Sequence, residues 1–316
     1  MTRLATDNVS ALAKLATGRE GEGRRALITG LRGFTGHYLA QELTAAGYRV
    51  FGTVMPGEET GPDVVAVDLC DREGLAAVIE DVKPDVVAHL AGIAFVGHAN
   101  VEAIYRVNVV GTRNLLEALV AGSHRPTSVL LASSANIYGN ADVAVISEDQ
   151  PPAPANDYAV SKLAMEYMAR LWMDKLPITI VRPFNYTGVG QAENFLLPKI
   201  VSHFRRNEQR IELGNIAIAR DFSDVRMVAR SYRRLLAAAP AGEAFNVCSG
   251  VPHTLSSVIE TMGEIAGYQI EVQVNPAFVR ANDVLQLTGS NQKLVAAVGD
   301  LAPTPLHETL RWMYQA

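Results

Sequence analysis

The sequence is poor in cysteine, and neither sign of charge dominates it. Cys70 and Cys248 are the only cysteines among 316 residues, too few for a disulfide framework and without a metal-ligand spacing. The 28 Lys and Arg residues against 33 Asp and Glu residues give a net charge of −5, so no electrostatic attraction to a nucleic acid is expected. These shortages argue against a secreted scaffold, a metal protein or a nucleic-acid-binding protein, and they favour a reducing, cytoplasmic location.

Long apolar runs are also missing. The longest run, Val86–Val96, is interrupted by His89, whereas a helix that spans a membrane needs about 20 apolar residues. Residues 1–24 contain basic residues but no apolar stretch of about 7–15 residues that would mark a secretory signal. We therefore expect no membrane association and interpret residues 1–24 as an N-terminal extension.

What the sequence does contain indicates a large α/β protein. Hydrophobic residues make up 48% of the chain, and at about 150 residues per domain the length fits two domains. From Arg25 onward, short β-branched runs alternate with amphipathic segments, which predicts a doubly wound parallel sheet covered by helices on both faces. The expected strands are Ala26–Thr29, Tyr48–Val54, Val64–Asp68, Asp85–Leu90, Ser128–Ala132 and Ile178–Val181. The expected helices are Phe34–Ala46, Arg72–Val82, one long helix within Val101–Ala121, and Asp157–Lys175.

The alternation changes after Pro183. A stretch rich in Gly, Asn and Gln follows, and the next apolar strand is Ala244–Val247. We interpret residues 25–184, joined by a returning unit at 224–248, as one domain, and residues 185–223 with 249–316 as a smaller substrate domain. Helices in this half are expected at Leu197–Arg206, Val225–Ala238, Leu255–Ala266 and Leu306–Met313.

A glycine-rich turn follows the first predicted strand, with the sequence GLRGFTG from residue 30 to residue 36. Glycines permit a tight turn and a close approach to a pyrophosphate, and the next helix presents free N–H groups to it. Glycines also occur in ordinary turns, but a position between a strand and an amphipathic helix favours dinucleotide binding. The predicted cofactor contacts of this turn are Gly30, Arg32, Gly33, Phe34, Thr35 and Gly36.

A second motif, Tyr158-Ala159-Val160-Ser161-Lys162, places a phenol and an ammonium group on one face of a helix. An ammonium group beside a phenol stabilises the phenolate and so lowers its pKa from about 10. Alone, this spacing occurs on many surface helices. Ser134, however, follows a buried strand at the edge where parallel sheets bind ligands, and its hydroxyl can hydrogen-bond a substrate oxygen.

Together these motifs resemble the extended short-chain dehydrogenase/reductases from Arg25 to the C-terminus. The resemblance implies a Rossmann domain that binds NAD(H) or NADP(H), with Ser134, Tyr158 and Lys162 as the catalytic residues. Further residues match the family's cofactor-binding positions: Asp68, Leu69, Leu90, Ala91, Gly92 and Asn108. The family's long helices pair in a four-helix bundle, so the resemblance also implies a homodimer through 101–121 and 157–175.

Within this family, dehydratases carry an acidic pair after the catalytic hydroxyl, at the positions of Ala135 and Asn136. Without those carboxylates, removal of water from a sugar is not expected. The segment RPFNYTGVGQ, residues 182–191, resembles RPFNHTGPGQ of GDP-6-deoxy-4-keto-D-mannose reductases, with Tyr186 and Val189 as departures. This implies reduction of the C4 keto group of a GDP-4-keto-6-deoxy-mannose to GDP-D-rhamnose, or to its C4 epimer GDP-6-deoxy-D-talose.

Other segments extend that resemblance to the substrate. An arginine can offer two parallel hydrogen bonds to a diphosphate, and an asparagine offers both a donor and an acceptor to a sugar. The resemblance implies that the substrate-binding residues are Asn185, Phe195, Leu196, Lys199, Gly214, Arg220 and Arg280. No residue is expected to bind a metal.

Two features of the sequence bear on the preferred nicotinamide cofactor. No carboxylate stands at the end of the strand Tyr48–Val54 to accept the ribose 2′-hydroxyl of NAD, and Arg32 can supply charge for a 2′-phosphate. These two features favour NADPH slightly over NADH.

Two other functions stay open. One is a nucleotide-sugar 4-epimerase that retains NAD, and the other is a catalytically silent nucleotide-sensing regulator.

Overall fold

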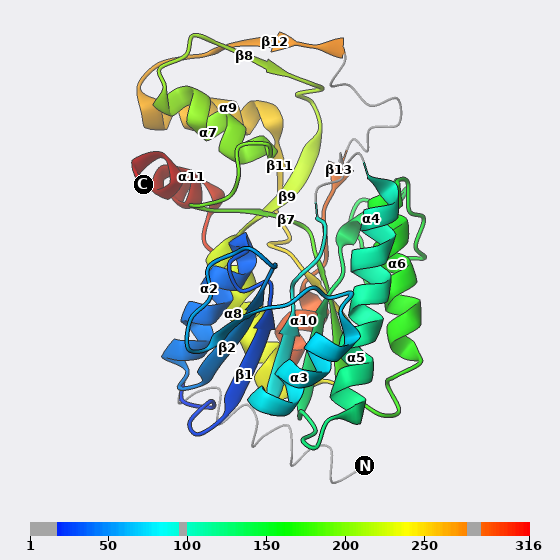
Figure 1. Cartoon of the computed structure of the whole chain (residues 1–316). Coiled ribbons are helices and arrows are strands. Elements are labelled where there is room, and N and C mark those ends of the chain that lie inside the picture. Colours follow the sequence, from blue (N-terminus) through cyan, green and yellow to red (C-terminus); the bar gives the residue numbers. More distant parts are fainter. Residues whose placement is uncertain (1–17, 95–99, 277–285) are drawn as a thin grey trace.

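The computed structural model describes residues 18–94, 100–276 and 286–316 of the chain. Figure 1 shows two lobes, a lower one around a parallel sheet and an upper one built from helices and short strands. None of the helices within the described ranges is long and apolar enough to span a bilayer.

The lower lobe contains a sheet of seven strands in the order β10-β6-β5-β4-β1-β2-β3. All six neighbouring pairs are parallel, so every strand ends at the same edge. The reversal of strand order between β1 and β4 creates the crevice in which such sheets bind ligands. The strands are β1 (Arg25–Thr29), β2 (Arg49–Val54), β3 (Val64–Ala66), β4 (Val86–His89), β5 (Ser128–Ala132), β6 (Ile178–Pro183) and β10 (Ala244–Val247).

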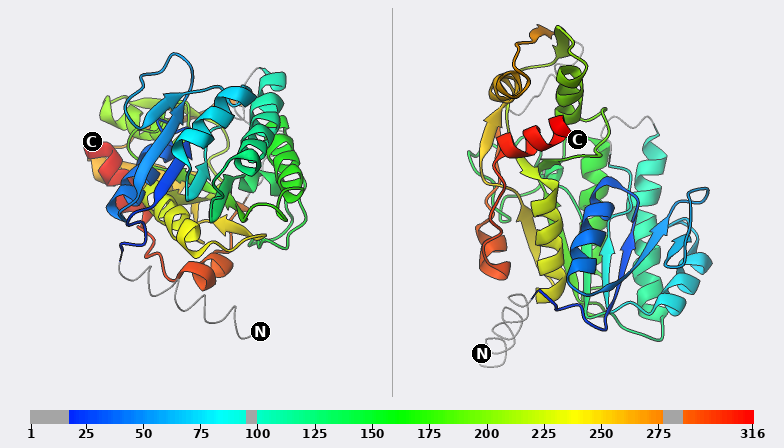
Figure 2. Two further views of the ribbon diagram at one scale, coloured as in Figure 1. Left: turned by 60° about the horizontal axis from the view of Figure 1, so that its bottom comes forward. Right: turned by 90° about the vertical axis from the view of Figure 1, so that its left-hand side faces the viewer.

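Helices cover both faces of this sheet, as Figure 2 shows from two further directions. Successive strand residues point to opposite faces, so Leu27 packs with one set of helices while Ala26 and Ile28 pack with the other. The helices on the first face are α3 (Arg72–Val82), α5 (Thr112–Ala121) and α6 (Asp157–Arg170). Those on the second face are α2 (Phe34–Ala45), α8 (Val225–Ala238) and α10 (Gln292–Val298).

The upper lobe has its own hydrophobic core, formed between three helices and the strand β8. Its helices are α7 (Leu196–Arg205), α9 (Leu255–Ala266) and α11 (Leu306–Gln315). Its strands are β7 (Asn185–Thr187), β8 (Arg210–Leu213), β9 (Ala219–Asp224), β11 (Pro252–Thr254), β12 (Glu271–Val274) and β13 (Gln286–Leu287). These six strands were not predicted, because none of them has the apolar run that marks a buried strand.

Two predicted helices differ from the observed ones. The long helix expected within Val101–Ala121 is divided, because a π-helical turn, η1 (Arg106–Gly111), lies between α4 (Val101–Tyr105) and α5. The helix expected to reach Lys175 ends at Arg170, where Leu171 N–H donates to the Met168 carbonyl in a tighter turn. The 3₁₀ helix η2 (Ala135–Tyr138) follows β5.

Candidate active site

The glycine turn lies at the carboxyl end of β1, and its backbone leaves no room for larger residues. Gly30 has a φ of +74°, and a Cβ built on it would lie 2.9 Å from the Ala91 nitrogen. A Cβ on Gly36 would lie 2.2 Å from the Gly30 carbonyl oxygen. The first N–H groups of α2 have no partner inside the helix, so this turn has the shape and the donors that fit a pyrophosphate.

The segment after β4 lies beside this turn. Leu90 N–H donates to the Thr29 carbonyl (3.2 Å), and Ala91 N–H donates to Thr29 Oγ1 (3.2 Å). Gly92 is exposed. The two turns that the sequence predicted to bind the cofactor therefore lie side by side, where the strand order reverses.

Asn108 holds that segment in place from the π-helical turn η1. Its Oδ1 accepts a hydrogen bond from Ile93 N–H (2.9 Å), while its Nδ2 donates to the Ile93 carbonyl (3.1 Å) and to Ser161 Oγ (3.0 Å). Asn108 is buried. Its side chain thus joins the segment after β4 to α6, next to Lys162.

Asp68 and Leu69 follow β3 and differ in exposure and in hydrogen bonding. Asp68 is exposed, and its Oδ1 accepts a hydrogen bond from Cys70 N–H (2.8 Å). Leu69 is buried, and its carbonyl accepts a hydrogen bond from Asn114 Nδ2 (3.1 Å). Of the two, only the Asp68 side chain is free to meet a ligand from solvent.

The structure brings Ser134, Tyr158 and Lys162 together at the carboxyl end of β5. A side-chain hydrogen bond joins Ser134 to Tyr158. Lys162 Nζ donates to the Ala132 carbonyl (2.8 Å) and would lie 3.4 Å from a Cβ built on Gly92. These three side chains therefore adjoin the crevice formed by the glycine turn and the segment after β4.

Asn136 controls the direction of the Ser134 hydroxyl. Both its backbone N–H and its Nδ2 donate to Ser134 Oγ at 3.1 Å. A hydroxyl has two acceptor lone pairs and one proton, so an oxygen that already accepts two bonds has its proton left to donate. Ser134 is thereby fixed as a donor. Its one proton goes to Tyr158 in the chain by itself, and a substrate oxygen beside Tyr158 could receive it instead.

The protonation states differ from the sequence-based expectation. Burial raises the pKa of Tyr158 to about 12, and its hydrogen bond to Ser134 offsets only part of that rise. Burial also lowers the pKa of Lys162 to about 8, although the nearby Glu166 carboxylate acts in the opposite direction. The expected lowering of the Tyr158 pKa by Lys162 is not found in the chain by itself. Loss of hydration dominates, and the groups that act on the phenol are Ser134, which lowers its pKa, and Tyr186, which raises it.

The predicted substrate residues lie along the upper lobe. Asn185 on β7 is exposed and pairs with Phe222 of β9, two residues from the half-buried Arg220. Phe195 immediately precedes α7, at the N-cap position, and Leu196 is the first residue of the helix. Gly214 follows β8. Arg280 lies outside the described residues.

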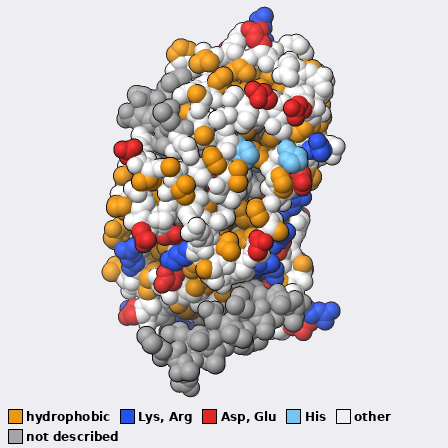
Figure 3. Space-filling view, turned by 180° about the vertical axis from the view of Figure 1, so that it is seen from behind, with side chains coloured by type: hydrophobic (Ala, Val, Ile, Leu, Met, Phe, Trp, Pro, Cys, Tyr) orange, Lys and Arg blue, Asp and Glu red, His pale blue; other side chains and the backbone are white. Residues whose placement is uncertain are grey.

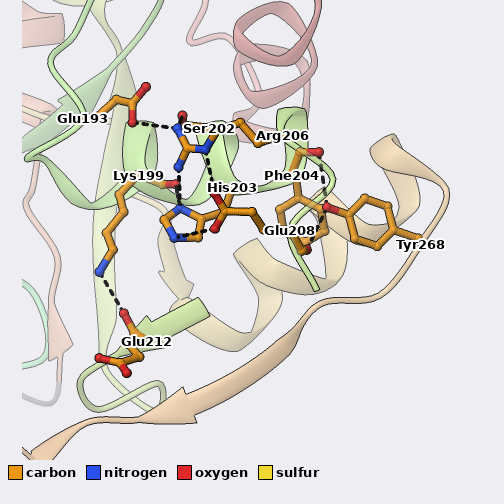
Figure 4. A network of polar contacts seen from close by, with 9 residues as sticks. All are labelled: Glu193, Lys199, Ser202, His203, Phe204, Arg206, Glu208, Glu212 and Tyr268. Atoms are coloured by element: carbon orange, nitrogen blue, oxygen red, sulfur yellow. Dashed lines mark hydrogen bonds and ion pairs between the residues drawn. The ribbon is translucent and has the colours of Figure 1, made fainter. Parts of the chain in front are cut away.

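Lys199 on α7 reaches β8, where its Nζ donates to the Glu212 carbonyl (2.8 Å), as Figure 4 shows. In the same network Arg206 contacts Glu193 and Glu208, and His203 contacts Glu208 (3.2 Å). These contacts attach the end of α7 to β8. Lys199 accordingly has a structural partner as well as its predicted role.

Tyr186 is a contact that the sequence analysis missed. Its ring stacks on Phe34, with centroids 5.9 Å apart, and its hydroxyl hydrogen-bonds Thr35 Oγ1 (2.7 Å). It therefore joins β7 to the start of α2. The departure from the RPFNHTGPGQ pattern at this position was the available signal.

The structure also differs from the sequence-based expectation at the end of β2. No carboxylate was expected there, yet Glu58 Oε2 accepts a hydrogen bond from Met55 N–H (2.7 Å), the first amide after the strand. The expectation was wrong because Glu58 is three residues farther along a turn that folds back.

Comparisons with known proteins agree with this geometry. The family described as GDP-mannose 4,6 dehydratase matches residues 27–313. The chain is 36% identical over 295 residues to GDP-6-deoxy-D-talose 4-dehydrogenase of Aggregatibacter actinomycetemcomitans, which covers 92% of this chain and 97% of that protein. It is 33% identical over 299 residues to GDP-6-deoxy-D-mannose reductase of Pseudomonas aeruginosa, with 91% and 95% covered.

Two solved structures are similar along nearly the whole chain. A candidate epimerase from Burkholderia cenocepacia J2315 has 55% identity and a TM-score of 0.89, with 93% of this chain and 98% of that chain covered. RMD from Pseudomonas aeruginosa, complexed with NADPH, has 32% identity and a TM-score of 0.81, with 92% and 98% covered.

Proposed function

Because the chain belongs to the GDP-mannose 4,6-dehydratase family of extended short-chain dehydrogenase/reductases, we propose that it reduces the C4 keto group of a GDP-4-keto-6-deoxy-mannose. The observation that carries this proposal is the pair of hydrogen bonds from Asn136 to Ser134 Oγ. A carboxylic acid in place of Asn136 would allow water to be removed from the sugar. The amide of Asn136 only directs the proton of Ser134 toward the substrate.

The reaction adds a hydride and a proton to a carbonyl. Bound NADH or NADPH supplies the hydride. Ser134 donates a hydrogen bond to the C4 oxygen, and Tyr158 gives its phenolic proton to the same oxygen as the alcohol forms. The raised pKa of Tyr158 keeps the phenol protonated at neutral pH in the chain by itself, so a proton is available for the C4 oxygen.

The remaining site residues have supporting roles in this proposal. Lys162 anchors the nicotinamide ribose, while the turn from Gly30 to Gly36 holds the pyrophosphate. The predicted substrate residues, Arg280 among them, bind the GDP-sugar. In this proposal residues 25–184 with 224–248 form the cofactor domain, and 185–223 with 249–316 form the substrate domain. The helix α10 is the exception, since it packs on the sheet of the cofactor domain.

The product is either GDP-D-rhamnose or GDP-6-deoxy-D-talose, which differ only in the face of C4 that receives the hydride. The names of the two curated relatives cover both sugars. NMR of the product, formed from freshly prepared 4-keto sugar with each reduced cofactor, assigns the configuration.

The decisive variant is Tyr158→Phe, which removes the proton donor and keeps the ring. We expect kcat to fall by about 10²–10⁴-fold, measured as loss of nicotinamide absorbance, with cofactor affinity unchanged. Wild-type turnover in this variant would contradict the proposal.

A second candidate is a nucleotide-sugar 4-epimerase, favoured by the 55% identity to the candidate epimerase from Burkholderia cenocepacia. An epimerase returns the hydride to the sugar and consumes no reduced cofactor. NAD that stays bound through purification, together with interconversion of C4 epimers without net oxidation, would favour it over the reductase.

The proposal includes a cytoplasmic homodimer with no nucleic-acid or membrane partner. On the face shown in Figure 3, acidic and basic side chains of the described residues are interspersed, and such a mixed surface does not attract a polyanion. The dimer is proposed to form through 101–121 and 157–175, where α4, η1 and α6 carry exposed apolar residues on their outer side.

A further inference from the structure

The turn that follows β2 folds its acidic side chains back toward the strand end. Glu58 N–H donates to the Met55 carbonyl (3.1 Å), and Met55 N–H donates to Glu58 Oε2 (2.7 Å). This reciprocal pair places a carboxylate on the first backbone donor beyond the strand.

The neighbouring residue, Glu59, occupies the other donor at this position. Arg32 of the glycine turn lies 3.2 Å from Glu59 Oε2 through its Nη1. The two turns are also joined through their backbones, because Gly30 N–H and Leu31 N–H both donate to the Thr53 carbonyl on β2 (3.0 and 3.1 Å). Arg32, Glu58 and Glu59 therefore belong to one small region where the ends of β1 and β2 meet.

In a doubly wound sheet the adenosine ribose of a dinucleotide lies at this region, and its 2′ substituent is recognised by the residues after β2. A 2′-phosphate needs backbone N–H groups and a guanidinium, whereas a 2′-hydroxyl needs a carboxylate as acceptor. Here the donors are Met55 N–H and Arg32, but both are already occupied. Met55 N–H donates to the Glu58 carboxylate, and Arg32 pairs with the Glu59 carboxylate.

We propose that Glu58 and Glu59 limit the chain's selectivity for NADPH by occupying the hydrogen-bond donors that a 2′-phosphate requires. To bind NADPH, the phosphate displaces both carboxylates, and Arg32 turns from Glu59 to the phosphate. To bind NADH, Glu58 stays in place and accepts the 2′-hydroxyl. The inference rests on the proposed function, since it concerns the cofactor of that reaction.

The energetics allow both cofactors to bind. The Arg32 and Glu59 side chains are 41% and 83% exposed, and an ion pair so open to water contributes little. The phosphate, with a charge of about −2, therefore replaces Glu59 easily, but it stays close to two displaced negative charges. The result is an enzyme that uses NADPH and NADH with modest discrimination.

The test measures cofactor binding without any sugar. NADPH and NADH are titrated separately into the full chain, and the nicotinamide fluorescence gives a Kd for each. In the double variant Glu58→Gln, Glu59→Gln, the ratio of Kd for NADH to Kd for NADPH is expected to rise by about tenfold, because two negative charges near the phosphate are removed. Arg32→Gln is expected to change the ratio in the opposite direction.

Glu22→Gln is the control, because it removes another exposed carboxylate of an arginine pair, the one with Arg19 on the N-terminal segment. Its Kd ratio is expected to equal that of the wild type. An unchanged ratio in the double variant overturns the inference. If the wild type binds neither cofactor, the proposed function fails as well, whereas normal binding with no reduction of the 4-keto sugar refutes the proposed function alone.

Discussion

At the scale of single residues, the charge of Lys162 depends on a buried ion pair beneath it. Glu166 lies one helical turn beyond Lys162 on α6 and is 1% exposed. Arg182 on β6 donates to both of its oxygens, through Nε (3.0 Å) and Nη2 (2.7 Å), and to the Tyr138 hydroxyl (2.9 Å). Glu166 thus holds Arg182 and also opposes the loss of charge that burial imposes on Lys162.

Replacing Glu166 by Gln should therefore move the pH dependence of the reaction. The pKa of Lys162, about 8 in the chain alone, falls further when the negative charge is removed, so the ammonium is lost at a lower pH. We expect the alkaline limb of kcat/KM to move down by about 0.5–1 pH unit. Glu166→Asp retains the charge and should restore the limb. An unchanged limb in a folded Glu166→Gln protein would show that Glu166 only supports the fold.

Residue patterns predicted part of this site. Ser134, Tyr158 and Lys162 were found because their spacing is local to one strand end and one helix. Glu166 and Arg182 were not singled out, although a glutamate at the next turn after Lys162 and an arginine within an apolar strand were the available signals. The position of Glu58 could not be predicted, because it depends on the path of a turn and not on a repeat.

At the scale of secondary structure, the segment before β1 is attached to the sheet domain. Gly21 N–H donates to the Ala46 carbonyl (2.9 Å). The side chain of Glu20 is 2% exposed and forms an ion pair with Arg233 of α8, and Arg233 also contacts Glu42 of α2 (3.1 Å). One short stretch thereby joins two helices on the same face of the sheet.

Removing this contact should destabilise the fold. We expect Glu20→Gln to lower the free energy of unfolding by about 1–3 kcal/mol. The variant leaves Arg233 buried and removes one of the two carboxylates that Arg233 contacts, so that Glu42 is left. Glu22→Gln, whose ion pair with Arg19 is exposed, should change it by less than about 0.5 kcal/mol. Urea denaturation measures both, and equal values for the two variants would refute the assignment.

Helix and strand patterns were predictable where burial is continuous. The strands β1, β4, β5 and β10 pack on both faces, so apolar runs marked them in the sequence. The π-helical turn η1 was not predictable, because its hydrogen bonds differ from those of an α-helix without a distinct residue pattern. Its effect is local, since it turns Asn108 toward Ile93 and Ser161.

At the scale of the whole molecule, the outer side of α4, η1 and α6 is the surface proposed for the dimer. Val160 and Tyr167 of α6 and the following Leu171 are spaced to lie on one side, and they are 37%, 54% and 74% exposed. Val101 and Val110 are exposed on the neighbouring helix. An apolar face of this kind favours burial against a second copy.

A charge on that face should separate the copies. We expect Leu171→Glu combined with Tyr167→Glu to convert a dimer into a monomer in light scattering, because each buried carboxylate would lack a partner. Val274→Glu is the control, since Val274 is 55% exposed on β12 in the other lobe. A wild-type monomer, or a dimer that survives both substitutions, would contradict the proposal.

The path of the chain between the lobes has a further consequence. After β6 the chain enters the upper lobe, returns with α8 and β10, leaves again, and returns with α10 before it ends in α11. No single peptide bond can be cut to release one lobe intact, since the sheet would lose its edge strand and two of its helices. Melting should consequently proceed as one cooperative event, and a fragment ending near residue 184 should aggregate through the apolar surface that α8 normally covers.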